Sequence, residues 1–187
     1  GNSLVDFCLG DTGAMFGHSP PAVAQAIAEQ AARGLTCMLP AQNVAAVGDA
    51  LADVFGLPWW QLTQTATDAN RAVLRLARAA TGRRRILVFN HCYHGTVDET
   101  LVVRGADGRT QPRPGQVGRV HDFGAETLVV EFNDSLALEA ALAGGDVACV
   151  LAEPVMTNAG MVLPLPGFLE GLRDACTRTG TLLAIDE

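Results

Sequence analysis

The chain has 187 residues, of which 49% are hydrophobic and 5% aromatic, and its formal net charge at pH 7 is −7. This length is enough for one domain of ordinary size with a packed core, or for part of a larger protein. The composition is typical of a packed α/β or α protein and excludes a disordered or fibrous chain. The negative charge argues against binding to nucleic acid or to an anionic membrane, since both need a basic surface.

The cysteines and the apolar segments indicate a reducing compartment. The five cysteines are widely spaced and form no Cys-x-x-Cys pair. No signal peptide is visible, and no apolar run reaches the roughly 18 residues that span a bilayer. We therefore expect a cytoplasmic protein with free thiols and no membrane partner.

The 13 basic residues counted as lysine plus arginine are all arginines, so the chain contains no lysine. A mechanism that needs an amine side chain therefore cannot be completed by these residues alone. The one basic cluster, Arg83-Arg84-Arg85, lies between a predicted helix and a predicted strand. A solvated helix C-terminus is its simplest interpretation.

The first 58 residues predict one strand and two helices. Residues 4–9 alternate between side-chain types as a strand does. Ser19-Pro20-Pro21 begins a helix that ends near Gly34, because serine can cap a helix and proline is tolerated in its first turn. A second helix runs from Pro40 to about Phe55. The predicted organisation is an N-terminal segment, 1–58, followed by a larger domain, 59–187.

The larger domain alternates between helix and strand. A helix is predicted over 69–81, with one apolar face formed by Ala69, Ala72, Val73, Leu76 and Ala80. Continuous apolar runs of strand length are 86–89, 127–130, 147–152 and 182–185, and helical patterns at 135–143 and 167–179 separate the last three. Because continuous apolarity is typical of strands covered on both faces, we predict a three-layer α/β fold with a mostly parallel sheet. Residues 104–126 are predicted to form a long loop.

Four polar features fall at the edge of this sheet where ligands bind, beyond the carboxyl ends of the strands. A threonine-rich turn, 65–67, precedes the 69–81 helix, so its N–H groups and hydroxyls can surround an anion. Tyr93, Asn158 and Asp186 each follow a different predicted strand. Together the four features predict one ligand-binding crevice.

Each feature also has a simpler structural explanation. Thr65 and Asp68 fit a capping box that needs no ligand. Tyr93 can be a packing residue, and Asn158 can stabilise its own turn. Asp186 can cap whatever follows it. The joint arrangement is therefore stronger evidence than any single residue.

His91 and His94 have the spacing of a possible metal pair. No third ligand is clear in the sequence, and no helix aligns the two imidazoles. We therefore predict no metal site.

Three segments of the chain resemble a known family: TATDANRAVLRLARAATGRRRILVFNHCYHG, LAEPVMTNAGMVLPLPGFLEGLR and LLAIDE. They are similar to the large domain of class III, fold-type-I pyridoxal-phosphate aminotransferases, and within it to the glutamate-1-semialdehyde aminomutase branch and its amino-acid transaminase relatives. The resemblance covers nearly the whole chain, and the spacing of three separate motifs makes it specific. It implies the large domain of that fold and pyridoxal 5'-phosphate as the cofactor.

The resemblance implies that the turn of Thr65, Ala66 and Thr67 binds the cofactor phosphate. The sequence departs from the family pattern here, since Ala66 replaces a usual glycine and the following Asp68 a usual glutamate. His91, near the tyrosine motif, also stands where glycine is usual. Because Ala66 replaces glycine, we expect the backbone to approach the phosphate more loosely or with a different shape.

The resemblance assigns the remaining cofactor contacts to three residues. Tyr93 is implied to stack on the pyridine ring, and Asn158 to lie near the phenolic oxygen. Asp186 is implied to contact the pyridine nitrogen, where a carboxylate keeps that nitrogen protonated and the ring able to accept electrons.

The family's Schiff-base lysine lies downstream of the Asp-Glu pair, so we expect more protein after Glu187. The leading expectation for function is transfer of an amino group between an amino acid or amine and a keto acid. The alternatives are an intramolecular amino shift, as in glutamate-1-semialdehyde 2,1-aminomutase, and a non-catalytic fragment, since the chain has no lysine. The resemblance also implies a homodimer when the protein is full length.

Overall fold

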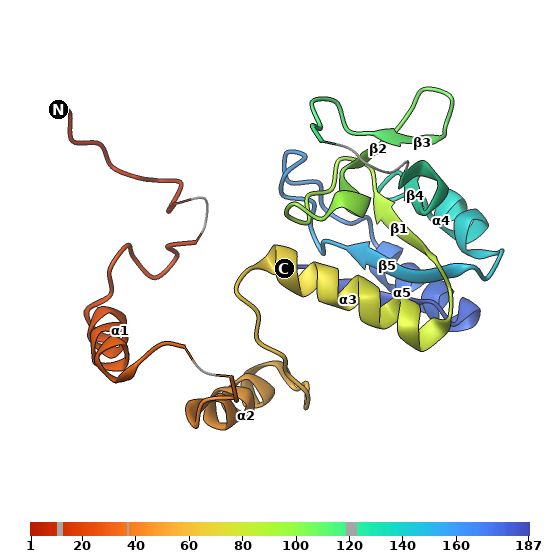
Figure 1. Ribbon diagram of the computed structural model, residues 1–187. Coiled ribbons are helices and arrows are strands. Elements are labelled where there is room, and N and C mark those ends of the chain that lie inside the picture. The colour runs from red at the N-terminus through yellow and green to blue at the C-terminus, as the bar shows by residue number, and fades with distance from the viewer. Residues whose placement is uncertain (11–12, 37, 119–122) are drawn as a thin grey trace. The chain divides into compact units, whose positions relative to one another are not determined.

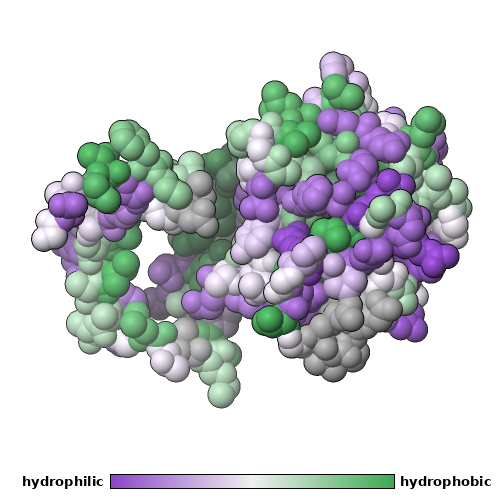
Figure 2. Space-filling view, turned by 90° about the horizontal axis from the view of Figure 1, so that it is seen from above, coloured by the Kyte–Doolittle hydropathy of each residue, from purple (hydrophilic) through white to green (hydrophobic). Residues whose placement is uncertain are grey.

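The computed structural model describes residues 1–10, 13–36, 38–118 and 123–187, which form two compact units, Gly1–Gln61 and Leu62–Glu187 (Figure 1). The smaller unit contains the helices α1 (Pro21–Arg33) and α2 (Asn43–Phe55). Neither helix has a buried residue, and Phe16 is 94% exposed. Hydrophobic side chains are exposed over this unit (Figure 2). The smaller unit therefore has no core of its own among the described residues.

The predicted strand over residues 4–9 is wrong. The Asp6 carboxylate accepts hydrogen bonds from the backbone N–H groups of Cys8, Leu9 and Gly10 at 2.9, 3.0 and 2.9 Å, which closes a turn. A strand also needs a neighbour to pair with, and the described part of this unit contains none. The two predicted helices are confirmed, although α2 begins at Asn43 rather than at Pro40.

The larger unit is a mixed α/β layer whose main elements follow one another along the chain: α3 (Ala66–Thr81), β1 (Arg85–Phe89), β4 (Thr127–Val130), α4 (Ser135–Leu142), β5 (Val147–Ala152), α5 (Phe168–Thr179) and β6 (Leu182–Ile185). The four strands pair in parallel in the order β4-β1-β5-β6. The mostly parallel sheet predicted from the continuous apolar runs is confirmed.

Helices cover both faces of this sheet. All six residues of β5 are buried, and α4 and α5 contact each other on one face while α3 lies on the other (Figure 1). The three-layer prediction is therefore confirmed. Among the described residues, no helix is long and apolar enough to cross a membrane.

The predicted apolar face of the helix over 69–81 is confirmed in part: Ala69, Ala72 and Val73 are half-buried, whereas Leu76 and Ala80 are exposed. α3 buries Asn70, Leu74 and Ala77, whereas Leu76 is 69% exposed. The helix also begins three residues earlier than predicted, at Ala66. Because alanines lie on several sides of this helix, the sequence does not show which side is buried. The buried side includes the polar residue Asn70.

The long loop predicted over 104–126 contains structure. A short antiparallel hairpin joins β2 (Val102–Arg104) to β3 (Thr110–Pro112), and two 3-10 turns, η1 (Asp98–Thr100) and η2 (Phe123–Ala125), flank it. The Thr110 hydroxyl donates to the carbonyl oxygen of Thr127 at 2.8 Å, which ties the hairpin to β4. Strands of three residues are too short to give an alternating pattern, so the sequence does not predict them.

Candidate functional site

The carboxyl ends of three neighbouring strands and the start of α3 supply the polar residues of the site. β1 leads into residues 90–95, β5 into residues 153–159, and β6 into Asp186. Because β1, β5 and β6 are adjacent and parallel in the sheet, the segments that follow them lie side by side at the carboxyl ends of the strands. This is the edge at which the sequence predicts a ligand.

Asp186 is held in place by hydrogen bonds from three directions. Its backbone N–H donates to the carbonyl oxygen of Ala152 at 2.9 Å. Its Oδ2 accepts a hydrogen bond from Asn70 Nδ2 at 2.9 Å and lies 2.7 Å from His94 Nδ1. Asn70 Nδ2 also lies 3.3 Å from the carbonyl oxygen of His94. The carboxylate therefore has a fixed position and orientation.

These contacts keep Asp186 ionised. Burial raises the pKa of the Asp186 carboxyl, but the hydrogen bonds from His94 and Asn70 and the His94 charge outweigh it, so the pKa lies below its ordinary value of 3.8. The His94 ring is buried, and its Nε2 has no hydrogen-bond partner among the described residues. Because this buried imidazole hydrogen-bonds through Nδ1 to the Asp186 carboxylate, His94 acts as a positioning group for it.

Tyr93 and Asp186 line the same hollow, which has a volume of about 310 Å³. The Tyr93 ring is 50% exposed, so it is not a core packing residue in this unit. Glu153 fixes the two segments that flank the ring: its carboxylate accepts from the N–H of Tyr93 at 3.1 Å and from the N–H of Thr157 at 3.0 Å. The structure therefore brings an aromatic ring and an ionised carboxylate to one opening.

In the threonine turn, Thr65 caps α3 and Thr67 contacts the segment that follows Tyr93. Thr65 caps α3: its Oγ1 lies 3.1 Å from the N–H of Asp68 and 2.9 Å from Asp68 Oδ2. Thr67 Oγ1 instead accepts from the N–H of Thr96 at 3.1 Å. A Cβ added to Gly95 would lie 2.0 Å from this oxygen, so only glycine lets the helix start approach the segment after Tyr93. Thr65 and Ala66 are exposed at the start of the helix.

Asn158 lines a different hollow from Asp186. It is exposed and lines a second hollow, of about 620 Å³, together with His91, Val103, Arg104, Arg113, Pro114 and Ala159. Thr157, the residue before Asn158, lines the hollow of Tyr93 and Asp186, so the two hollows have neighbouring lining residues. The two histidines also diverge, because His94 is buried against Asp186 whereas His91 lines the second hollow. Among the described residues, no group of three or more His, Cys, Asp or Glu side chains could hold a metal ion.

Two residues of the site were not predicted from the sequence. Asn70 reaches Asp186 from α3, and His94 reaches it from the segment after β1. Asn70 could have been found from helical spacing, since it lies four and seven residues before the buried Leu74 and Ala77. An amide on the buried face of a helix needs a polar partner.

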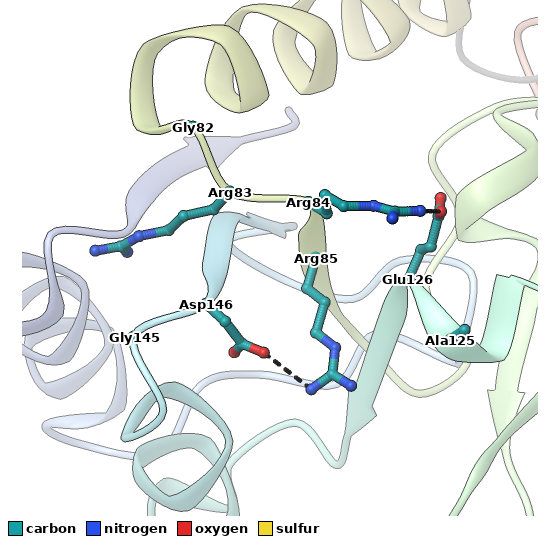
Figure 3. A pocket seen from close by; sticks show the side chains of 8 residues that line it. All are labelled: Gly82, Arg83, Arg84, Arg85, Ala125, Glu126, Gly145 and Asp146. Carbon is teal, nitrogen blue, oxygen red and sulfur yellow. Dashed lines mark hydrogen bonds and ion pairs between the residues drawn. The ribbon is translucent and has the colours of Figure 1, made fainter.

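A third hollow, of about 570 Å³, lies at the amino ends of the strands. It is lined by Arg83, Arg84 and Arg85 among others (Figure 3). Arg84 pairs with Glu126, and Arg85 Nη1 lies 3.0 Å from Asp146 Oδ2. Arg83 donates to the carbonyl oxygens of Val147 and Thr179 at 3.0 and 2.8 Å. All three guanidinium groups are engaged by the protein, so this edge is stabilised internally.

Comparison with known proteins places these features in a family. Residues 1–187 match the family model described as aminotransferase class-III. Glutamate-1-semialdehyde 2,1-aminomutases of Bordetella avium and Chloroflexus aurantiacus are both 38% identical over 100% of this chain. The alignments cover 44% and 43% of those proteins, so the chain spans less than half of their length.

Solved structures give the same relationship. A glutamate-1-semialdehyde aminomutase from Pseudomonas aeruginosa PAO1 is 58% identical, with a TM-score of 0.93 over 98% of this chain and 40% of its own. A variant of that enzyme has been solved in complex with PMP. An omega-transaminase from Sphaerobacter thermophilus is 29% identical, with a TM-score of 0.85 over 97% of this chain and 43% of its own.

Proposed function

Because the chain belongs to the class-III aminotransferase family, we propose that it forms the cofactor-holding part of a pyridoxal-phosphate enzyme that moves an amino group within one substrate. The observation that carries this proposal is the 58% identity to a glutamate-1-semialdehyde aminomutase, against 29% to an omega-transaminase. The sequence patterns alone favour transamination with a keto acid. The relatives favour the intramolecular shift.

The residues at the carboxyl edge fit pyridoxal phosphate. The cofactor has an anionic phosphate, an apolar ring face and a basic ring nitrogen. The start of α3 offers N–H groups to an anion, the half-exposed Tyr93 offers an aromatic face, and Asp186 offers an ionised carboxylate. Gly95 lies close to Thr67, so the start of α3, which offers N–H groups to an anion, lies near the segment that carries Tyr93. This proximity supports the fit.

Each group has a separate task in this proposal. When bound, pyridoxal phosphate supplies an electron-accepting ring that stabilises negative charge beside the amino group. Asp186 holds a proton at the ring nitrogen, and Asn70 and His94 keep Asp186 ionised and oriented. Tyr93 covers one face of the ring, and the turn of Thr65, Ala66 and Thr67 binds the phosphate. Asn158 is assigned to the cofactor's phenolic oxygen.

The amine that moves the substrate proton has to come from elsewhere, since these residues include no lysine. We therefore expect the 187-residue chain on its own to lack activity. A lysine supplied by the rest of the protein at the carboxyl edge of the sheet would complete the site. We also propose that the full-length protein is a homodimer, in which the exposed apolar residues of the smaller unit are covered.

A turnover assay of the full-length protein tests the proposed function. An intramolecular amino shift consumes glutamate 1-semialdehyde without any keto acid, and isomerises it to the product that carries the amino group on carbon 1. We expect turnover in the absence of a keto acid. Strict dependence on an added keto acid would exclude the amino shift and favour transamination, the second candidate, which the similarity to an omega-transaminase supports.

A further inference from the structure

Glu153 is a buried carboxylate at the carboxyl ends of the strands. It follows β5 directly, is 7% exposed, and lines the hollow that also contains Tyr93 and Asp186. Within the described part of the chain, no arginine or histidine forms an ion pair with it. Because a buried carboxylate is costly unless hydrogen bonds satisfy it, the groups that donate to Glu153 show what holds it there.

Three donors from two segments converge on the Glu153 carboxylate. Its Oε1 accepts from the backbone N–H of Tyr93 at 3.1 Å. Its Oε2 accepts from the backbone N–H of Thr157 at 3.0 Å and from the hydroxyl of the same residue at 3.3 Å. The two segments follow β1 and β5, which are neighbours in the sheet. One side chain therefore ties the segment after β1 to the segment after β5, and it needs two accepting oxygens to do so.

The segment after β5 is closed into a loop that contains Asn158. Met156 and Val162 exchange two backbone hydrogen bonds, each of 3.1 Å, and residues 157–161 lie between them. Thr157 is the first residue of this loop, so its bonds to Glu153 fix where the loop begins. A displacement of the Glu153 carboxylate would consequently move the start of the loop and the backbone of Tyr93 together.

The Tyr93 side chain depends on its backbone for its position. It is 50% exposed, and it forms no hydrogen bond or aromatic pair with any side chain that the structure describes. Its backbone N–H is the group that Glu153 holds. The contact with Glu153 thus acts directly on the residue that carries the ring.

We propose that Glu153 is a positioning residue that sets the Tyr93 ring against the cofactor and couples it to the loop that carries Asn158. This inference rests on the proposed function, because it takes Tyr93 to cover the cofactor ring. In a purely structural role, Glu153 would only satisfy two buried N–H groups. Its substitution would then lower stability without changing what Tyr93 contributes to cofactor binding.

A double-mutant cycle in the full-length protein separates the two roles, with the dissociation constant of pyridoxal phosphate as the readout. Glu153→Gln keeps the size of the side chain but replaces one accepting oxygen with an amide donor, so one segment loses its acceptor. We expect the affinity to fall by about tenfold, within the range for one lost hydrogen bond to a charged group. If Glu153 acts through Tyr93, the double variant with Tyr93→Ala should bind at least about threefold more tightly than the product of the two single losses predicts.

The circular dichroism of the bound cofactor gives a second readout, because it depends on the orientation of the ring in its asymmetric surroundings. Glu153→Gln should change the intensity or sign of the cofactor band. Glu131→Gln is the matched control: Glu131 also lies at the carboxyl end of a strand, and its Oε1 accepts from Asn90 Nδ2 at 2.8 Å, a bond that glutamine can keep. This control should leave both the affinity and the cofactor band unchanged.

Thermal denaturation of the cofactor-free variants shows which of them are folded. Glu153→Asp keeps both oxygens on a side chain that is one methylene shorter, so it cannot hold both segments in their present positions. It takes the place of Glu153→Gln in the cycle if the glutamine variant does not fold.

An unchanged affinity, losses that multiply in the double variant, or an unaltered cofactor band would overturn the positioning role of Glu153. Losses that do not multiply, together with an altered band, support this role even if turnover requires a keto acid, in which case only the proposed amino shift fails. An amino shift that persists beside multiplying losses refutes the role of Glu153 and leaves the proposed function standing.

Discussion

The two ends of the parallel sheet carry the same kinds of charged side chain, but their partners differ. At the amino end, Arg84 and Arg85 are paired with Glu126 and Asp146 (Figure 3). At the carboxyl end, Asp186 accepts a hydrogen bond from Asn70 and lies 2.7 Å from the His94 imidazole. Charge pairing at the amino end stabilises the fold, whereas the contacts of Asp186 fix a carboxylate that also lines the hollow shared with Tyr93.

The largest expected effect comes from Asp186→Asn in the full-length protein. Asparagine keeps the shape of the side chain and cannot hold a proton on the ring nitrogen as a charged partner does. We expect the cofactor to remain bound and turnover to fall by about a hundredfold or more, the size of the loss when one electrostatic stabiliser is removed. Asp146→Asn, at the amino end, should leave turnover unchanged, and near wild-type turnover in Asp186→Asn would disprove its assignment.

Gly95→Ala should destabilise the protein more than Gly145→Ala does. Both glycines have positive φ, 75° and 66°, but a Cβ at Gly95 meets Thr67 Oγ1 at 2.0 Å whereas one at Gly145 meets nothing within 4 Å. Both substitutions therefore have the energetic cost of an alanine in the left-handed region, and overpacking adds about 1–3 kcal/mol at Gly95 alone. Thermal denaturation of the two variants measures this difference, and equal melting temperatures would show that the helix start is not held close to Gly95.

Asn70→Ala should raise the pKa of Asp186 and lower the free energy of unfolding by about 1–3 kcal/mol at neutral pH. The pKa of Asp186 is lower in the folded than in the unfolded protein, so its contribution to stability is present above pH 3.8 and is lost as the pH falls through the folded value. The destabilisation by Asn70→Ala should therefore shrink in acid. Carbon-13 NMR titration of Asp186 checks the shift, and an unaltered pKa would mean that Asn70 does not stabilise the carboxylate.

The smallest expected effect comes from Arg84→Ala at the amino end. The Arg84 side chain is 83% exposed, and surface ion pairs contribute only about 0.2–1 kcal/mol. We expect a small loss of stability that disappears at high salt, because exposed charges are screened. Denaturant titrations at low and high salt measure it. A loss of several kcal/mol would mean that the amino end depends on this pair.

The sheet and its helices could be predicted because the strands are buried on both faces and their apolar runs are continuous. The 4–9 segment shows the limit of this reasoning, since its alternation arises from a turn closed by Asp6. The hairpin at 102–112 was missed because its strands have three residues each and take their stability from β4.

Individual residues of the site were predicted from the sequence, but the hydrogen bonds that hold them were not. Tyr93 and Asp186 were expected to converge, and the structure places them around one hollow. The bonds from Asn70 and His94 to Asp186 span 116 and 92 residues of sequence, and no local pattern reports a contact of that kind. That Asn158 lines a different hollow from Asp186 depends on the path of residues 153–159, which a motif does not specify.

The protonation state of the cofactor's ring nitrogen tests the central claim most directly. Nitrogen-15 NMR of the full-length protein loaded with ring-labelled pyridoxal phosphate measures this state at neutral pH. We expect a protonated nitrogen in the wild type and an unprotonated one in Asp186→Asn. A nitrogen equally protonated in both proteins, or unprotonated in the wild type, would contradict it.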